Sequence, residues 1–458
     1  MPAEAKKISL PNAFRKSYQE EFGPTELALL EEALTKPLSS ALRTHPQKNF
    51  APNLRPVPWC DRGFFTDIEA TFGADPIWHA GGYYVQEPAS MILSQYFEQH
   101  KIHPARALDL CAAPGGKSTL LRSYLPDSCT LISNEPDATR ARILSENFAR
   151  WGMDETIITS AYPNKIAETG LLFDFILVDA PCSGEGMFRK EPQALTGWSP
   201  QNVELCVTRQ KEILNAAWEM LEKDGVLIYS TCTYNKKENE DQLDYISGLG
   251  EIEILPLSLN QKWGVQSHRA GVYRFTPQHT ESEGLTIFAI RKKGGGNTSI
   301  TTKKEKAKKG LPSLLNEVFT DKQDALYNHN DSWYYLSPAG QEQLAQLKKI
   351  KILAGGVQLG QLKGKDFIPD TNWVHSGSLN EHLPYPRYEL DNESAIQYLK
   401  RENIKLDEDL DKGIYLVTYK ELPLGIVKHL GNRTNNLYPK ELSIKNRNLK
   451  TEDIPNWD

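Results

Sequence analysis

RALDLCAAPGGKSTLLRSYL, residues 106–125, runs from a short apolar stretch through a turn with two glycines into a pattern typical of a helix. This order predicts a strand, a tight loop, and a helix that starts with Ser118 and Thr119. Further strands are predicted at 130–133, 156–159, 173–178 and 225–230, and helices at 137–152 and 203–221. The first of these helices is expected to be capped by Asp137 and stopped by Gly152. Strands alternating with helices predict an α/β fold with a doubly wound parallel sheet, to which GLTIFAIRK, residues 284–292, adds a late strand.

The composition is typical of a soluble globular protein with several domains. Of the 458 residues, 39% are hydrophobic and 24% charged, and no apolar run approaches the roughly 20 residues that span a bilayer. The opening residues contain no signal-peptide pattern, so we expect a cytoplasmic protein with no membrane partner. The cysteines form no CxxC pair and have no histidine at ligand spacing, which argues against a zinc site. A disulfide framework is not expected either, because the chain is long and the expected compartment is reducing. The cysteines are Cys60, Cys111, Cys129, Cys182, Cys206 and Cys232.

Changes in composition suggest five segments. Residues 1–100 mix helical stretches such as 24–42 with a Pro-rich run and predict a small helical and mixed N-terminal module. Residues 101–293 hold the α/β pattern, and 294–310 have the Gly, Thr and Lys content of a basic flexible linker. Beyond it, 311–385 and 386–458 contain short β-rich runs between Gly and Pro turns, which predict a small barrel or half-barrel. We expect 311–458 to be removable without loss of cofactor affinity.

The loop after the first predicted strand is suited to a cofactor. Gly115 and Gly116 allow close approach of a ligand, and the helix behind them offers free N–H groups. Glu135 stands at the end of the second strand, where an acidic residue holds a ribose diol. The G-x-G-x-x-G pattern is absent and Pro114 lacks a backbone donor, so S-adenosylmethionine fits better than a dinucleotide. The simpler alternative is a tight glycine turn with no ligand.

Two cysteines follow neighbouring strands of the predicted sheet. FDFILVDAPCSGEG ends with Asp179 and Cys182 after the fourth strand, and GVLIYSTCTYNKKENE carries Cys232 after the fifth. Adjacent strands lie about 4.8 Å apart, so both thiols are expected to overhang one pocket. The alternative is that both are small buried hydrophobic residues. Nearby polar residues and glycines favour an exposed loop instead; they are Ser183, Gly184, Glu185, Gly186, Thr231, Thr233 and Asn235.

Three of these segments closely resemble the signatures of the RNA cytosine-5 methyltransferases. They are LDLCAAPGGK (108–117), VDAPCSGEG (178–186) and YSTCTYNKKENE (229–240), and the resemblance spans roughly residues 10–293. It includes GGYYVQEPASM (81–91) and YRFTPQH (273–279). It implies a class I Rossmann-like sheet that binds S-adenosylmethionine.

The resemblance also implies roles for individual residues. Cys232, in the Thr-Cys motif, is expected to add to C6 of cytosine, because the addition makes C5 nucleophilic. Cys182, in the Pro-Cys motif, is expected to assist release of the methylated base. Asp179 is expected to lie by the cytosine N3 and amine, and Lys117 to reach the base. DNA enzymes use the Pro-Cys thiol as nucleophile, so Cys232 favours RNA as substrate.

The implied cofactor-binding set comes from the first three strand ends and the Pro-Cys loop. It comprises Cys111, Ala112, Ala113, Pro114, Gly115, Gly116, Lys117, Glu135, Arg140, Ser160, Asp179 and Pro181. One departure from the family pattern is visible. An Asp for the adenine amine usually follows the third strand, but here the strand runs into SAYPNK, residues 160–165. Ser160 or backbone atoms are expected to take its place.

LPLGIVKHLGNRTNNLYPKELSI, residues 422–444, resembles the C-terminal PUA-like domain of bacterial 16S rRNA methyltransferases of the RsmF type. The resemblance implies 16S rRNA within the small ribosomal subunit as the partner, and we expect the protein to act as a monomer. A phosphate-contacting and stacking surface is predicted, with a solvated basic face as the alternative. Its residues are Lys428, His429, Arg433, Tyr438, Lys440, Lys445, Arg447 and Lys450.

Two other functions stay open. A tRNA cytosine-5 methyltransferase would have the same catalytic domain, and only the C-terminal resemblance argues against it. An inert RNA-binding ribosome assembly factor would need no catalytic set. The presence of Cys182, Cys232, Asp179 and Lys117 counts against that alternative.

Overall fold

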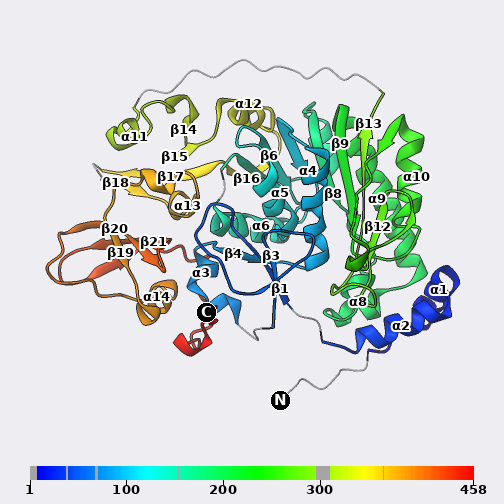
Figure 1. Cartoon of the computed structure of the whole chain (residues 1–458). Helices are drawn as coiled ribbons and strands as arrows, with labels where there is room; N and C mark the ends of the chain where they lie inside the picture. Colours follow the sequence, from blue (N-terminus) through cyan, green and yellow to red (C-terminus); the bar gives the residue numbers. More distant parts are fainter. Residues whose placement is uncertain are drawn as a thin grey trace.

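The computed structural model describes residues 8–37, 40–67, 71–152, 154–294, 310–364 and 366–457, and the statements below concern these residues. The predicted linker at 294–310 lies outside them except for Gly294 and Gly310. A large central sheet lies between layers of helices, with the N-terminal helices at the lower right of Figure 1 and the C-terminal strands on the left.

The central sheet has ten strands and confirms the predicted α/β fold. Nine of them follow the order β11-β12-β13-β9-β8-β5-β6-β7-β16, and β10 (Ile252–Ile254) pairs with β13. The parallel strands are β5 (Arg106–Asp109), β6 (Thr130–Asn134), β7 (Thr156–Ser160), β8 (Phe173–Asp179) and β9 (Leu221–Thr231). The antiparallel strands β11 (Gln266–Arg269), β12 (Val272–Phe275) and β13 (Leu285–Lys292) extend it beyond β9. Strand order reverses between β5 and β8, which is where ligands bind in such sheets.

Helices cover both faces of this sheet, because alternate residues of each strand point to opposite sides. One apolar core joins the sheet to α4 (Leu93–His100), α5 (Gly116–Tyr124) and α6 (Ala138–Trp151). The other joins it to α7 (Pro163–Ala167), α9 (Pro200–Met220) and α10 (Glu240–Leu249). Asp137 caps α6 and Gly152 ends it, as predicted. Helix α5 begins at Gly116 and not at Ser118, because Gly115 turns the chain with a φ of 117°.

The N-terminal module combines a helical hairpin with a small sheet. Its helices are α1 (Asn12–Phe22) and α2 (Pro24–Leu34). Its strands, in the order β2-β3-β1-β4, are β2 (Arg55–Pro56), β3 (Gly63–Thr66), β1 (Ser40–Thr44) and β4 (Tyr83–Val85). The helical expectation for 24–42 is therefore wrong at its end, since residues from Ser40 form a strand that pairs with β3 and β4.

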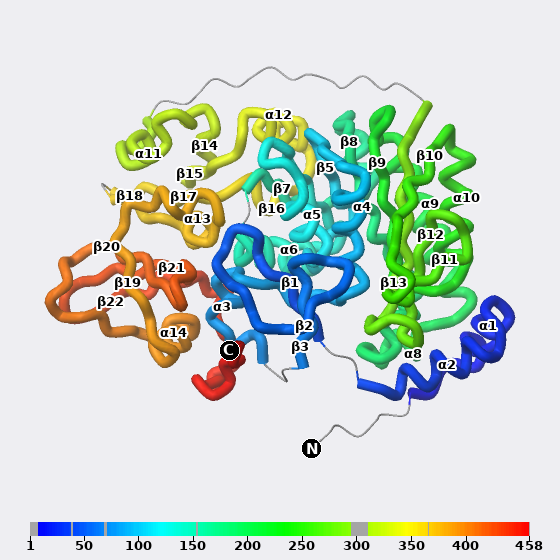
Figure 2. Tube along the Cα trace, viewed as in Figure 1, coloured from blue at the N-terminus to red at the C-terminus, as the bar shows by residue number. Residues whose placement is uncertain are grey.

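The C-terminal third forms two four-stranded sheets and also lends a strand to the central sheet. The first sheet contains β14 (Leu326–His329), β15 (Ser332–Tyr335), β17 (Val357–Lys363) and β18 (Asp366–Pro369). The second contains β19 (Arg387–Glu389), β20 (Gly413–Tyr419), β21 (Leu422–His429) and β22 (Thr434–Asn436). The strand β16 (Lys351–Gly355) lies between β15 and β17 in sequence but belongs to the central sheet, where it pairs antiparallel with β7. Figure 2 shows β16 beside β7 at the edge of the central sheet.

Shared cores tie the C-terminal third to the rest of the chain. The buried cluster between the central sheet and α9 also contains three residues that flank α12 (Pro338–Gln346), namely Leu336, Leu347 and Ile350. The second C-terminal sheet and α14 (Asn392–Leu399) share a core with the N-terminal module, where Trp457 donates a 2.8 Å hydrogen bond to buried Asp75. Removal of residues 311–458 would thus expose the β7 edge of the central sheet. The expectation that this deletion leaves cofactor affinity unchanged assumed an independent C-terminal part, and the structure does not have one.

Candidate active site

The two predicted thiols lie together at the carboxyl ends of β8 and β9. These strands pair in parallel with Asp179 opposite Ser230, so the loops that follow them emerge side by side. Cys182 Sγ and Cys232 Sγ are 3.2 Å apart, and both residues are partly accessible. The N–H of Gly186 donates a 2.8 Å hydrogen bond to the carbonyl of Cys232, which joins the two loops directly. The expected proximity of the two thiols is therefore present in the structure.

Lys117 and Asp179 form an ion pair beside the thiols. Lys117 Nζ donates to Asp179 Oδ2 at 2.8 Å, and Ser230 Oγ donates to Asp179 Oδ1 at 2.7 Å. Burial acts to lower the pKa of Lys117, but the charge of Asp179 and its hydrogen bond outweigh burial, and the charge of Cys232 adds to them. The pKa of Lys117 is therefore raised above its ordinary value. The lysine stays charged next to the Cys232 sulfur.

The environments of the two thiols differ. The hydrogen bond with Cys232 and burial raise the pKa of the Cys182 thiol well above its ordinary value, and the charge of Glu238 acts in the same direction. Cys182 therefore keeps its proton, whereas Lys117 places a positive charge near Cys232. The two thiols therefore share one hydrogen bond, and Lys117 supplies a positive charge beside them.

The polar residues around the thiols are buried, which corrects the expectation of an exposed loop. Their relative exposures run from zero at Thr231 and Thr233 to 9% at Asn235. Each one finds hydrogen-bond partners inside the protein; for example, Thr231 Oγ1 donates to Asn239 Oδ1 at 2.7 Å. Polar side chains in sequence indicated solvent, but here they satisfy one another in a closed network. The polar side chains around the thiols thus belong to the protein interior.

The predicted cofactor loop lies between β5 and α5 and is held by its neighbours. Ala112 N–H donates to the Asn134 carbonyl at 2.8 Å, which ties the loop to the end of β6. From α6, Arg140 Nη2 donates to the Ala113 carbonyl and Asn147 Nδ2 to the Pro114 carbonyl, both at 2.8 Å. The loop is therefore fixed from two sides before any ligand binds. Cys111, Gly115 and Gly116 complete the loop. Pro181 follows β8, the strand that pairs with β5.

Glu135 fits the ribose-binding role. It is 3% exposed at the end of β6, and its Oε1 accepts from the Asp137 N–H at 3.0 Å. Its other oxygen, Oε2, is buried and has no hydrogen-bond donor among the described residues, although Arg140 Nη1 lies 3.5 Å away. An unsatisfied buried acceptor beside a glycine-rich loop is what a ribose hydroxyl would complete. Ser160 lies next to Glu135 at the end of β7, because Glu135 N–H donates to the Thr159 carbonyl.

The sequence interpretation missed three residues. Glu238 is fully buried and connects the two cysteine loops, and Ser230 orients Asp179. Asp109, at the end of β5, accepts a 2.6 Å hydrogen bond from Ser118 Oγ, and burial raises its pKa to about 7. Asp109 could have been found from the sequence, because it is a charged residue at the end of an apolar strand. Glu238 lay in the quoted YSTCTYNKKENE segment without a distinguishing feature.

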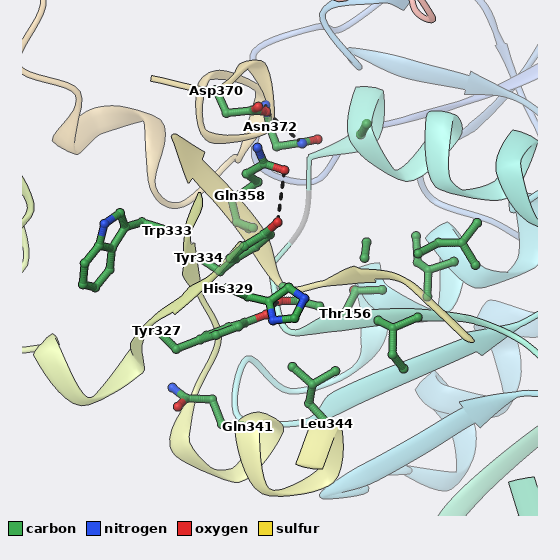
Figure 3. A pocket seen from close by; sticks show the side chains of 18 of the residues that line it. Thr156, Tyr327, His329, Trp333, Tyr334, Gln341, Leu344, Gln358, Asp370 and Asn372 are labelled. Atoms are coloured by element: carbon green, nitrogen blue, oxygen red, sulfur yellow. Dashed lines mark hydrogen bonds between the residues drawn. The ribbon is translucent and has the colours of Figure 1, made fainter. Parts of the chain in front are cut away.

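A cavity of about 1130 Å³ lies away from the thiols, where the C-terminal third meets α6 and β7. None of the predicted catalytic or cofactor residues lines it. In Figure 3 the rings of Tyr327 and Tyr334 stack, with centroids 5.2 Å apart, and Tyr334 Oη donates to Gln358 Oε1. Within the described ranges, no group of three or more His, Cys, Asp or Glu side chains is arranged to hold a metal ion. No helix there is long and apolar enough to cross a membrane.

The prediction of a phosphate-contacting and stacking surface in the C-terminal part is wrong for two residues. Tyr438 and His429 are each 1% exposed, so neither can stack on a base. The Tyr438 hydroxyl instead forms a 3.0 Å hydrogen bond with His79 of the N-terminal module. The basic side chains that remain at the surface are Arg433, Lys440, Lys445, Arg447 and Lys450. These charges, without the aromatic ring, form the candidate phosphate-contacting surface.

Comparisons with known proteins match three segments of the chain to family models. Residues 99–291 match the family model of the 16S rRNA methyltransferase RsmB/F, residues 10–88 that of the N-terminal domain of 16S rRNA methyltransferase RsmF, and residues 385–444 that of the methyltransferase RsmF PUA domain. The ribosomal RNA small subunit methyltransferase F of Salmonella paratyphi A is 30% identical, over 95% of this chain and 97% of the relative. That of Klebsiella pneumoniae is 28% identical, over 85% and 84%.

The structure of a methyltransferase homologue from Pyrococcus horikoshii, 25% identical, superposes with a TM-score of 0.54 over 64% of this chain and 99% of that one. S-adenosylmethionine is the methyl donor in this fold, and the loop 111–116 with Glu135 fits it. The three matched segments together carry the family's N-terminal, catalytic and PUA parts in its own order. The chain therefore belongs to the family of the 16S rRNA methyltransferases RsmF.

Proposed function

We propose that this protein methylates C5 of a cytosine in 16S rRNA through a covalent bond between Cys232 and C6 of the base. The observation that carries the proposal is the 3.2 Å pair of thiols at the ends of adjacent strands, beside the Lys117–Asp179 ion pair. Methyl transfer to nitrogen or oxygen needs no enzyme thiol, because the lone pair of the acceptor atom attacks the methyl group directly. Two thiols at one site suit a reaction that both forms and breaks a carbon–sulfur bond.

The first half of the reaction makes C5 reactive. The Cys232 thiolate forms a bond to C6, the electron pair of the C5–C6 double bond shifts to C4–C5, and that of the C4–N3 double bond moves onto N3. There the Lys117 ammonium can donate a hydrogen bond to N3, and Asp179 can accept one from the exocyclic amine. When bound, S-adenosylmethionine supplies an electrophilic methyl group on its sulfonium. C5, now enamine-like, would take that methyl group, and the sulfonium–methyl bond would break with its electron pair on the sulfur of S-adenosylhomocysteine. Asp179 and Lys117 are fixed by Ser230 and by each other, so they need little rearrangement during attack.

The second half releases the product. The C5 proton passes to solvent, its electron pair restores the C5–C6 double bond, and the C6–S bond breaks with its pair on the Cys232 sulfur. Cys182 supports this step because its raised pKa keeps a proton that can be shared with the departing sulfur 3.2 Å away. Each thiol thus has one task.

The substrate assignment follows from the accessory parts. A cytosine stacked in a helix cannot reach the thiols, so the target must be unpaired or flipped. The family's PUA domain and the basic side chains at its surface support contacts to rRNA phosphates by residues 386–458, with residues 1–100 as a second RNA-binding module. We place the protein in the cytoplasm, acting as a monomer on 16S rRNA within the small subunit.

Tritium release tests the position of methylation. 16S rRNA carrying [5-³H]cytidine is incubated with the protein and S-adenosylmethionine, and tritium in water is counted against methyl groups incorporated. C5 methylation predicts one tritium released for each methyl group transferred at a labelled cytosine. Methyl incorporation without tritium release would refute the proposal. Equal activity on tRNA and 16S rRNA would refute the substrate assignment and favour the tRNA alternative.

A further inference from the structure

Two buried glutamates cross between the loops that carry the thiols. Glu238, from the loop of Cys232, accepts hydrogen bonds from the N–H and the hydroxyl of Ser183, next to Cys182. Glu185, from the loop of Cys182, accepts from the N–H groups of Tyr234 and Asn235, just beyond Cys232, at 2.7 and 3.1 Å. Each loop therefore sends a carboxylate to hold the backbone of the other.

Both carboxylates are fully supplied with donors. Besides the backbone groups, Asn235 Nδ2 donates to both Glu185 and Glu238 at 2.9 Å. Trp198 Nε1 completes Glu185 at 3.1 Å, and Gln210 Nε2 completes Glu238 at 2.8 Å. An ionised carboxylate accepts about four hydrogen bonds, whereas a protonated one would have to give up an acceptor site. The geometry is thus built for two negative charges.

This arrangement is costly for the fold. Glu185 is 1% exposed and Glu238 is fully buried. Burial, followed by the charge of Glu238, raises the pKa of Glu185 to about 7. Apolar packing of similar volume often replaces buried charges without loss of stability, so stability alone does not explain why two lie here. A demand for fixed loop geometry does explain them.

The N-terminal helical hairpin closes the outer side of this cluster. The Trp198 ring meets the edge of Phe14 at a centroid distance of 5.3 Å, and the Tyr234 ring meets Tyr18 at 6.2 Å. Both contacts come from α1, so water is kept from the glutamates by a segment distant in sequence. In a water-poor environment the hydrogen bonds of a carboxylate are stronger and more directional.

We propose that Glu185 and Glu238 are positioning residues that hold the Cys182 and Cys232 sulfurs at a fixed separation while the C6 bond forms and breaks. The proposal rests on the proposed function for its role in catalysis, but the positioning itself concerns only the free protein. Both carboxylates are buried and occupied by donors of the protein, so neither is free to contact a base. Glu238 has a second effect, since its charge helps to keep the proton on Cys182.

The matched variants are Glu185→Gln, Glu238→Gln and Glu240→Gln. Gln keeps the shape of the side chain but turns one acceptor oxygen into a donor, which opposes the N–H groups that now point at it. Glu240 is also buried, at 5% exposed, and pairs with Arg274 at 2.8 Å outside the cysteine loops. It therefore controls for the loss of a buried charge as such.

The first readout needs no methyl transfer. Diamide takes two hydrogen atoms from the Cys182 and Cys232 thiols to give one disulfide and the reduced hydrazine, and the rate is followed by alkylation and mass spectrometry. Glu185→Gln and Glu238→Gln should slow this oxidation by about tenfold or more, because a displacement of about 1 Å can cost about 100-fold in a proximity-dependent reaction. Glu240→Gln should stay within about twofold of the wild type.

The second readout is steady-state kinetics with 16S rRNA. The two positioning variants should lose about 10- to 100-fold in kcat with KM for RNA nearly unchanged. If Glu238→Gln does not fold, Ser183→Ala removes only one donor to Glu238 and should slow oxidation by a smaller factor. Oxidation rates equal to that of Glu240→Gln would overturn the proposal. Slowed oxidation in a protein that does not methylate C5 would uphold the positioning and refute the proposed function.

Discussion

Replacement of Leu347 by Ala tests whether the C-terminal third is part of the catalytic domain. Leu347 follows α12, is completely buried, and belongs to the cluster that includes Ile132 of β6 and Ile157 of β7. Truncation of a buried leucine costs about 2–5 kcal/mol through lost burial and the cavity left behind. For a domain of 150–250 residues, 1 kcal/mol shifts Tm by about 2–4 °C, so Leu347→Ala should lower Tm by about 4–20 °C.

The matched control is Leu362→Ala, in β17 of the same region. Leu362 is 44% exposed, so its truncation should change stability by less than about 0.5 kcal/mol. Tm is measured by circular dichroism with and without saturating S-adenosylmethionine. The cofactor should raise Tm of the Leu347 variant, because a ligand of the native state stabilises it. Equal Tm for the two variants would show that residues 336–350 do not share the sheet's core, and would refute the fold described above.

Three further predictions concern single side chains. The pKa of Asp109 rises from 3.8 to about 7 on folding, so its contribution to stability is fully present below about pH 4 and is lost as the pH rises through 7. The free energy of unfolding of the wild type should therefore fall relative to that of Asp109→Asn between these pH values, as measured by denaturant titrations. Tyr438→Phe should lose about 0.5–1.5 kcal/mol of stability with unchanged RNA affinity, whereas Lys440→Ala should weaken RNA binding and reduce the log–log salt slope by about 1; a loss of RNA affinity in Tyr438→Phe would contradict its buried role. Glu135→Gln should weaken S-adenosylmethionine binding by about 10- to 100-fold in calorimetry, with Glu146→Gln on α6 as the unaffected control, and equal affinities would remove Glu135 from the ribose site.

Local patterns were sufficient for the five parallel strands of the central sheet and for β13, but not for β10, β11, β12 and β16. Each parallel strand contains a short, mostly apolar stretch, and the helices between them carry caps such as Asp137, so their order along the chain could be predicted from the sequence. The neighbourhood of Cys182 and Cys232 followed from the same order, because parallel strands bring their carboxyl ends to one edge. These features depend on residues close in sequence.

Contacts between distant segments could not be predicted in this way. The pairing of β16 with β7 joins Lys351 to Ser160, and nothing in KILAGG distinguishes an edge strand of one sheet from a strand of another. Tyr438 looked like a surface ring because basic residues flank it, but the N-terminal module covers it. Glu185 looked like a solvent-exposed residue for a similar reason, since its partner loop is about 50 residues further along the chain.

Covalent trapping tests the central claim, that Cys232 attacks C6 and Cys182 permits release. Cys182→Ala, Cys232→Ala and the double variant are incubated with 16S rRNA and S-adenosylmethionine and run on a denaturing gel. Cys182→Ala should give a protein–RNA complex that survives denaturation, and the other two should give none, because without Cys232 no carbon–sulfur bond can form. A stable complex formed by Cys232→Ala and absent from Cys182→Ala would contradict the account.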